Sequence, residues 1–212
     1  MKLQEYASRK LFSKYGIPTK PFYVVKTAQE AKEAAESLKL PVVIKAQVLV
    51  GGRGKAGGIK LAETAQDAEV KASQILGMEI KGIQVKKLLV AEAVDIAEEY
   101  YLSIVLDRQE KKPLIIVSTR GGVNIEQIAQ NTPEAIKKFY VEPLIGIKPY
   151  LARRAGYLLF GKGEKAKQLG SMVLSLYRLF MENRARLVEI NPLSVDNEGK
   201  LWAVDAKIIL DD

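Results

Sequence analysis

A glycine-rich run, Gly51–Gly58, is the first stretch of this sequence whose residue types could do chemistry. Its five glycines in eight residues rule out a packed element and let backbone amides approach an anion closely. Arg53 and Lys55 add positive charge, and Lys45 lies just before the run, where a lysine on an apolar strand needs an anionic partner. We therefore predict a phosphate-binding loop. The alternatives are a mobile surface hairpin and an ordinary edge-strand lysine.

Two other glycine patterns resemble phosphate motifs but do not fit them. Gly52, Gly54 and Gly57 match G-x-G-x-x-G, yet a dinucleotide fingerprint opens a helix, and this run leads into the strand-like residues Ile59–Leu61. Gly156–Gly163 matches G-x-x-x-x-G-K, but no Ser or Thr follows to hold magnesium, and its middle is bulky and apolar. We interpret it as the end of a core helix with a glycine cap.

Three oxygen-bearing side chains lie on the two arms of the last predicted hairpin. Glu189 and Asn191 share a face because side chains alternate along a strand. Asn191 and Asp205 are about equally far from the centre of the turn, so they are predicted to lie side by side. An amide oxygen and a carboxylate suit Mg²⁺ bound together with phosphate oxygens and water. The alternative is a hydrogen-bonded polar pair across the strands.

Carboxylates also follow the apolar stretch Leu88–Val90, at Glu92, Asp95, Glu98 and Glu99. They stand at the junction of two predicted lobes. Carboxylates accept hydrogen bonds from ribose hydroxyls, so this cluster is a candidate sugar site. A solvated acidic connector is the alternative.

The composition limits the remaining chemistry. The chain has 212 residues, 33 Lys and Arg against 25 Asp and Glu, and neither His nor Cys. Histidine bases, thiolate nucleophiles and His- or Cys-ligated metals are therefore excluded. Acidic residues are interspersed among the basic ones along the chain. The net charge of +8 therefore favours attraction of a small polyanion over nucleic-acid binding. Because no signal peptide and no apolar run of about 18 residues is found, we expect a cytoplasmic protein without a membrane segment.

Periodicity and capping residues predict the elements that position these side chains. The first half is predicted to contain helices at 2–15, 27–38 and from 64 onward, and strands at 22–25, 41–50, 59–61 and 84–94. The second half is predicted to contain strands at 100–106, 114–118 and 136–141, helices at 149–160 and 164–183, and a hairpin of 186–195 with 200–210. Hairpins outnumber parallel crossovers, which favours an α+β fold with mainly antiparallel sheets. The expected lobes are a smaller one, 20–95, and a larger one, 1–19 with 96–212.

This order of features resembles an ATP-grasp domain, in which two lobes close on a nucleotide. More closely, six stretches resemble the amino-terminal half of a succinyl-CoA synthetase (succinate–CoA ligase) β subunit: MKLQEYASRKLFSKYGIP, VVIKAQVLVGGRGKAGGIKLA, EEYYLSIVLDR, STRGGVNIEQIA, EINPL and VDAKI. The resemblance runs from residue 1 to residue 212.

The resemblance implies a role for individual residues. Those implied to contact the nucleotide are Lys45, Gly52, Arg53, Gly54, Glu92, Val94 and Glu99. Those implied to ligate Mg²⁺ are Asn191 and Asp205, and those implied to act in catalysis are Glu189, which steadies the phosphorylated group, and Arg53, which neutralises its charge. Phosphoryl transfer leaves a protein chiefly to position oxygens and neutralise charge, which such a set can do.

The reaction implied by the resemblance is succinate + CoA + NTP to succinyl-CoA + NDP + phosphate, a step of the tricarboxylic acid cycle, with ATP/ADP or GTP/GDP as nucleotide. It passes through a phosphohistidine on an α subunit that also binds CoA, in agreement with the lack of histidine here. The carboxy-terminal CoA-ligase domain of the β subunit is expected to be absent, so the chain is expected to be an incomplete enzyme. The alternatives are a malate–CoA ligase or ADP-forming acyl-CoA synthetase, or a non-catalytic basic module that binds a polyanion.

Overall fold

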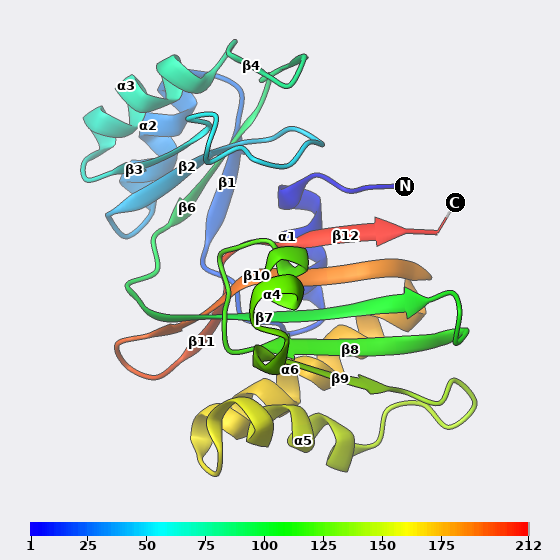
Figure 1. The fold of residues 1–212 in the computed structure, drawn as a ribbon. Helices are drawn as coiled ribbons and strands as arrows, with labels where there is room; N and C mark the ends of the chain where they lie inside the picture. Colours follow the sequence, from blue (N-terminus) through cyan, green and yellow to red (C-terminus); the bar gives the residue numbers. More distant parts are fainter. Residues whose placement is uncertain (212) are drawn as a thin grey trace. The chain divides into compact units, whose positions relative to one another are not determined.

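The computed structural model describes residues 1–211, and the chain divides into two compact units (Figure 1). The small unit is Lys20–Ala93, and the large unit is Met1–Thr19 together with the chain from Val94 onward. Each unit has a hydrophobic core of its own.

The small unit is a four-stranded antiparallel sheet with two helices packed on it, and its strand order is β1-β6-β2-β3. Its elements are β1 (Phe22–Val25), α2 (Ala28–Ser37), β2 (Val42–Ala46), β3 (Ile59–Ala62), α3 (Ala65–Ile75), β4 (Glu79–Ile80), β5 (Ile83–Gln84) and β6 (Leu88–Glu92). As predicted, Thr27 and Thr64 cap the two helices, because each side chain accepts a hydrogen bond at 3.1 Å from the amide three residues on. Alanines of both helices pack against Val42, Ile44 and Ala46, which alternate along β2.

The large unit is built on a six-stranded antiparallel sheet of order β11-β10-β7-β8-β9, with β12 also paired to β10. Its elements are α1 (Glu5–Lys14), β7 (Ile96–Asp107), β8 (Lys112–Ser118), α4 (Ile125–Asn131), the 3₁₀ turn η1 (Pro133–Ala135), β9 (Ile136–Tyr140), α5 (Pro149–Phe160), α6 (Glu164–Glu182), β10 (Ala185–Asp196), β11 (Leu201–Ala203) and β12 (Lys207–Leu210). Leu102, Ile104 and Val188 face the core formed with α5 and α6, which lie below the sheet in Figure 1. Because side chains alternate, Tyr101 and Glu189 lie on the other face.

The first residues of the chain extend this sheet rather than helix α1. Leu3 donates its amide to the carbonyl of Ile208 at 3.0 Å, and Leu210 donates to the carbonyl of Met1 at 2.8 Å. The helix predicted over 2–15 therefore begins only at Glu5. Phe12 then enters the core of the large unit.

Most predicted elements are present, and the antiparallel sheets and the α+β class are confirmed. The Gly156–Gly163 motif is a helix end, as predicted: α5 ends at Phe160, and Gly161, with φ of 67°, donates to the carbonyl of Tyr157 at 2.8 Å. In the described part of the chain, no helix is both long and apolar enough to cross a membrane.

Besides the late start of α1, three expected elements differ from the structure, and one helix has no predicted counterpart. The strand expected over 41–50 ends at Ala46, where the side chain of Gln47 folds back onto the carbonyls of the strand. The strand expected over 84–94 is interrupted, because Val85 exchanges backbone hydrogen bonds with the segment Gly77–Met78. The second arm of the last hairpin breaks between β11 and β12, and α4 was not predicted at all.

Candidate functional site

The glycine-rich loop joins β2 to β3 in the small unit, where Lys45 is paired in register with Ile59. The loop folds on itself: Gly58 donates to the carbonyl of Arg53 at 2.8 Å, and Gly57 to that of Gly54 at 3.0 Å. Gly52, with φ of 86°, adopts a backbone conformation that disfavours other residues. Since the run leads into a strand, the rejection of a dinucleotide fingerprint is confirmed.

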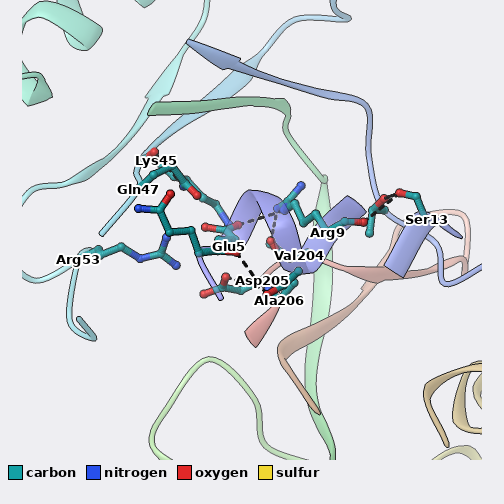
Figure 2. Close-up of polar contacts among 12 residues, drawn as sticks. Glu5, Arg9, Ser13, Lys45, Gln47, Arg53, Val204, Asp205 and Ala206 are labelled. Atoms are coloured by element: carbon teal, nitrogen blue, oxygen red, sulfur yellow. Dashed lines mark hydrogen bonds and ion pairs between the residues drawn. The ribbon is translucent and has the colours of Figure 1, made fainter. Parts of the chain in front are cut away.

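Two cations lie at the carboxyl end of β2. The Lys45 side chain is buried, with its residue only 5% exposed, and alternation places it on the face away from α2 and α3. Arg53 folds back so that its guanidinium donates to the carbonyl of Ala46 at 3.1 Å. Figure 2 shows Lys45, Gln47 and Arg53 gathered at this end of the strand. A buried ammonium beside a guanidinium favours an anion as ligand.

The predicted sugar-binding carboxylates are divided between the units. Glu92 ends β6 in the small unit, and one of its oxygens accepts from the amide of Lys39 at 3.2 Å. Val94 opens the large unit, and Glu99 is an exposed residue of β7. A Cβ on Gly122 would lie 2.4 Å from Oε2 of Glu99, so this carboxylate lies directly against the loop before α4.

The other acidic residues of that cluster have structural partners. Asp95 accepts a short hydrogen bond from the side chain of Asn197. Glu98 accepts a short hydrogen bond from Tyr100 and pairs with Lys165 at 3.2 Å, and these two contacts hold the pKa of Glu98 below its usual range. Both carboxylates are exposed, and both have partners within the large unit.

Glu189 is held on the open face of the large sheet by two neighbours. The hydroxyl of Tyr101 donates to its Oε2 at 2.9 Å, and Lys207 of β12 approaches Oε1 at 3.4 Å. Burial of Tyr101, and then the negative charge of Glu189, raise the pKa of this tyrosine, so it remains a donor at neutral pH. The Glu189 carboxylate is therefore fixed in direction, and Lys207 at 3.4 Å balances only part of its negative charge.

Asn191 connects the sheet to the loop before α4. Its Oδ1 accepts from the amide of Gly122 at 2.8 Å, and its Nδ2 donates to the carbonyl of Val123 at 3.0 Å. The pairing of β10 with β7 shifts register between Ile190 and Leu193, which marks a bulge at this asparagine. Bulges re-aim side chains and are common beside functional sites.

Asp205 lies opposite Asn191, as predicted. Leu193 pairs with Ala203 and Glu189 with Lys207, and this common register places Asp205 against Asn191 in the break between β11 and β12. Both residues are half-buried. One oxygen of Asp205, Oδ1, accepts from the amide of Ala206 at 2.9 Å.

These two oxygens fit a magnesium ion that is bound mainly through its ligand. A carbonyl oxygen has two lone pairs and a carboxylate has two oxygens, so both side chains carry acceptors of the type that Mg²⁺ binds. Mg²⁺ usually takes one or two protein oxygens together with phosphates and water. Within residues 1–211 no cluster of three or more acidic side chains could hold a metal by itself.

The sequence pattern does not show which groups hold these residues. Tyr101 lies in a predicted strand, where the period of two from Glu99 places it on the face that carries Glu189. Gly122 and Val123, which bond Asn191, are far from it in sequence, so no local pattern relates them. Arg9 and Glu5 belong to the helix predicted over 2–15, and no local pattern relates them to Asp205.

The two antiparallel α+β units and their sites agree with a known class of protein. A family model described as ATP-grasp domain matches residues 2–195. The chain belongs to this family.

Over its whole length the chain is 47% identical to the β subunit of an ADP-forming succinate–CoA ligase from Bacteroides thetaiotaomicron and 50% identical to that of a GDP-forming one from Thermus thermophilus. The predicted resemblance to these β subunits is confirmed. The chain spans 57% and 56% of the length of these two relatives.

Solved structures show the same fold. A dinucleotide-forming acetyl-coenzyme A synthetase of Ca. Korarchaeum cryptofilum, in complex with coenzyme A and Ca-AMPCP, superposes with a TM-score of 0.81 at 19% identity, covering 99% of this chain and 93% of that one. ATP citrate lyase of Methanothrix soehngenii gives a TM-score of 0.75 at 22% identity, covering all of this chain and 51% of that one. At such identities the likeness establishes the fold.

Proposed function

We propose that this chain is the nucleotide- and Mg²⁺-binding part of a succinyl-CoA synthetase. The observation that carries the proposal is the register that sets Asn191 against Asp205, beside the oriented carboxylate of Glu189. Support comes from the identity of 47% and 50% with succinate–CoA ligase β subunits.

In this proposal the phosphates of the nucleotide are bound by Lys45, Arg53 and the backbone of Gly52 and Gly54. Lys45 is 5% exposed, and a cation buried at the end of β2 suits a phosphate ligand. Glu92, Glu99 and the backbone near Val94 bind the sugar and base.

Asn191 and Asp205 hold Mg²⁺, which when bound neutralises the phosphate oxygens during transfer. Glu189, fixed by Tyr101, faces the phosphorylated group. The 212 residues contain no histidine, so a phosphohistidine acceptor would lie outside them. We propose that it is a histidine of a CoA-binding α subunit, and that the rest of a β subunit completes the enzyme.

The direct test is thermal denaturation of the 212-residue chain with ADP or GDP, with and without Mg²⁺. A ligand at 100 times its Kd stabilises the folded state by about 2.7 kcal/mol. We expect stabilisation that needs both nucleotide and Mg²⁺, loss of the Mg²⁺ effect in Asp205→Asn, and loss of most nucleotide binding in Lys45→Met. Lys162→Met, in the glycine cap after α5, is the matched control and should behave as the parent chain. No shift with any nucleotide at millimolar concentration would refute the proposal.

The substrate acid is tested separately, because related CoA ligases share this fold. Addition of a succinate–CoA ligase α subunit and the missing β-subunit portion should give CoA- and nucleotide-dependent activity with succinate. Higher activity with malate or acetate would reassign the enzyme within its class. Salt-sensitive retention of RNA that ATP does not compete would instead favour a polyanion-binding module.

A further inference from the structure

A buried ion pair on α1 reaches the backbone next to Asp205. Glu5 and Arg9 are 5% and 3% exposed, and Nε of Arg9 donates to Oε1 of Glu5 at 3.0 Å. The guanidinium also donates a short hydrogen bond from Nη2 to the carbonyl of Val204 (Figure 2). Arg9 thus bridges the first helix of the large unit and the break between β11 and β12.

The residue opposite Val204 in the sheet cannot donate a hydrogen bond to its carbonyl. In the common register of β10 with β11 and β12, Val204 faces Pro192, and its amide donates to the carbonyl of Pro192 at 3.3 Å. In a complete antiparallel pair of this kind the opposite residue would return a hydrogen bond from its own amide. Proline has no N–H, so it cannot do so. The guanidinium of Arg9 supplies the missing donor to the Val204 carbonyl.

The segment Val204–Ala206 is therefore oriented from α1 as well as from the sheet. Ala203, just before it, donates to the carbonyl of Pro18 at 2.8 Å, and Leu3 donates to Ile208 just after it at 3.0 Å. The amino-terminal residues hold both ends of the break, and Arg9 holds its middle. Asp205 lies within this supported segment.

A gain in folding stability is a weak explanation for the buried Glu5–Arg9 ion pair. Replacing a buried ion pair by apolar side chains of similar size is often neutral or stabilising, whereas an arginine fork fixes geometry in two directions at once. The Glu5–Arg9 pair fixes one carbonyl, at the residue before a proposed metal ligand.

We propose that Arg9, held by Glu5, is a positioning residue for the Mg²⁺ ligand Asp205. The inference rests on the proposed function, since it gives the pair a role only if Asp205 binds Mg²⁺. Partners that orient metal ligands typically change metal affinity by roughly 10- to 100-fold when they are removed.

The test compares the 212-residue chain with Glu5→Met/Arg9→Met, which removes both charges together, and with the exposed control Lys14→Met on the same helix. The Mg²⁺ concentration that gives half of the ADP-dependent thermal stabilisation is measured for each. We expect it to rise roughly 10- to 100-fold in the double variant only, with the shift given by ADP in EDTA unchanged. Equal Mg²⁺ requirements would overturn the proposal, because a purely structural pair would lower the melting temperature without changing them.

A second readout separates this inference from the proposed function. Hydrogen exchange of the amides of Val204, Asp205 and Ala206 should be faster in the double variant and unchanged in Lys14→Met. If the parent chain shows no Mg²⁺-dependent stabilisation, the proposed function fails, whatever the exchange shows. If the parent chain does show Mg²⁺-dependent stabilisation, and these amides exchange at the same rate in the parent chain and in the double variant, Arg9 does not orient the segment. Should the double variant not fold, Arg9→Lys, which keeps the charge but loses the fork, takes its place with the same readouts.

Discussion

Helices α5 and α6 cross at two glycines that face very different surroundings. A Cβ built on Gly156 of α5 would lie 2.1 Å from the carbonyl oxygen of Ala166 and 2.8 Å from its carbon. A Cβ built on Gly170 of α6 would lie 3.5 Å from the carbonyl oxygen of Ala152, an ordinary contact. The same substitution to alanine should therefore have opposite effects at the two positions.

Two contributions to the free energy of unfolding, helix propensity and overpacking, set the size of each effect. Alanine is favoured over glycine in a helix by about 0.8–1 kcal/mol. Overpacking a core costs about 1–3 kcal/mol, and a contact of 2.1 Å with rigid backbone places Gly156→Ala at the upper end. We expect Gly156→Ala to lose about 2 kcal/mol net, and hence about 4–8 °C of melting temperature, at about 2–4 °C per kcal/mol. Gly170→Ala should gain up to about 1 kcal/mol, or about 2–4 °C.

Circular dichroism melts of the two variants and the parent chain decide the question. Helix content at low temperature should be unchanged in all three, so that the difference lies in stability alone. A gain in Gly156→Ala, or a loss in Gly170→Ala as large as the loss in Gly156→Ala, would refute the packing geometry of this helix pair.

Three further outcomes can be measured on the same chain. Thr27→Ala removes the cap that accepts from the amide of Glu30 and should cost about 1 kcal/mol in urea denaturation, against no change for Thr27→Ser. Burial raises the pKa of the Tyr177 hydroxyl above its ordinary value of about 10, so the unfolded chain loses this proton first. The free energy of unfolding should therefore fall as the pH rises above about 10, and Tyr177→Phe should flatten that fall. Asp196→Ala removes the acceptor of the indole of Trp202 at 2.7 Å, so the fluorescence of this one tryptophan should change, and an unchanged spectrum would contradict the contact.

Much of the architecture could be predicted because local signals specify it. Thr27 and Thr64 cap helices by accepting hydrogen bonds from amides only three residues further on, and Gly161 ends α5 through a local turn. The opposition of Asn191 and Asp205 followed from counting outward from one turn, because the hairpin register continues across the break.

The remaining features depend on contacts that a local pattern does not contain. The late start of α1 at Glu5 goes with the pairing of the first residues to β12, far away in the sequence, and the break after Ala203 lies opposite Pro192. The bond from Arg9 to Val204 joins residues 195 positions apart, so the same arginine reads in sequence as an ordinary helix residue. The partners of Asn191 in the loop before α4 are similarly remote.

The contact between the two ends of the large unit also sets the order in which the protein can fold during synthesis. The small unit, Lys20–Ala93, is continuous and has its own core, so it can fold soon after it leaves the ribosome. Helix α1 (Glu5–Lys14) is made long before its partners in β12 (Lys207–Leu210), and at about 5–20 residues per second it waits roughly ten seconds or more for them. Phe12 lies in a core whose other members are made in steps, those of α6 before those of β12, so this core is complete only when Leu210 has been made. Nascent chains of this protein should therefore depend on chaperones most while the segment between Val94 and Leu210 is being translated.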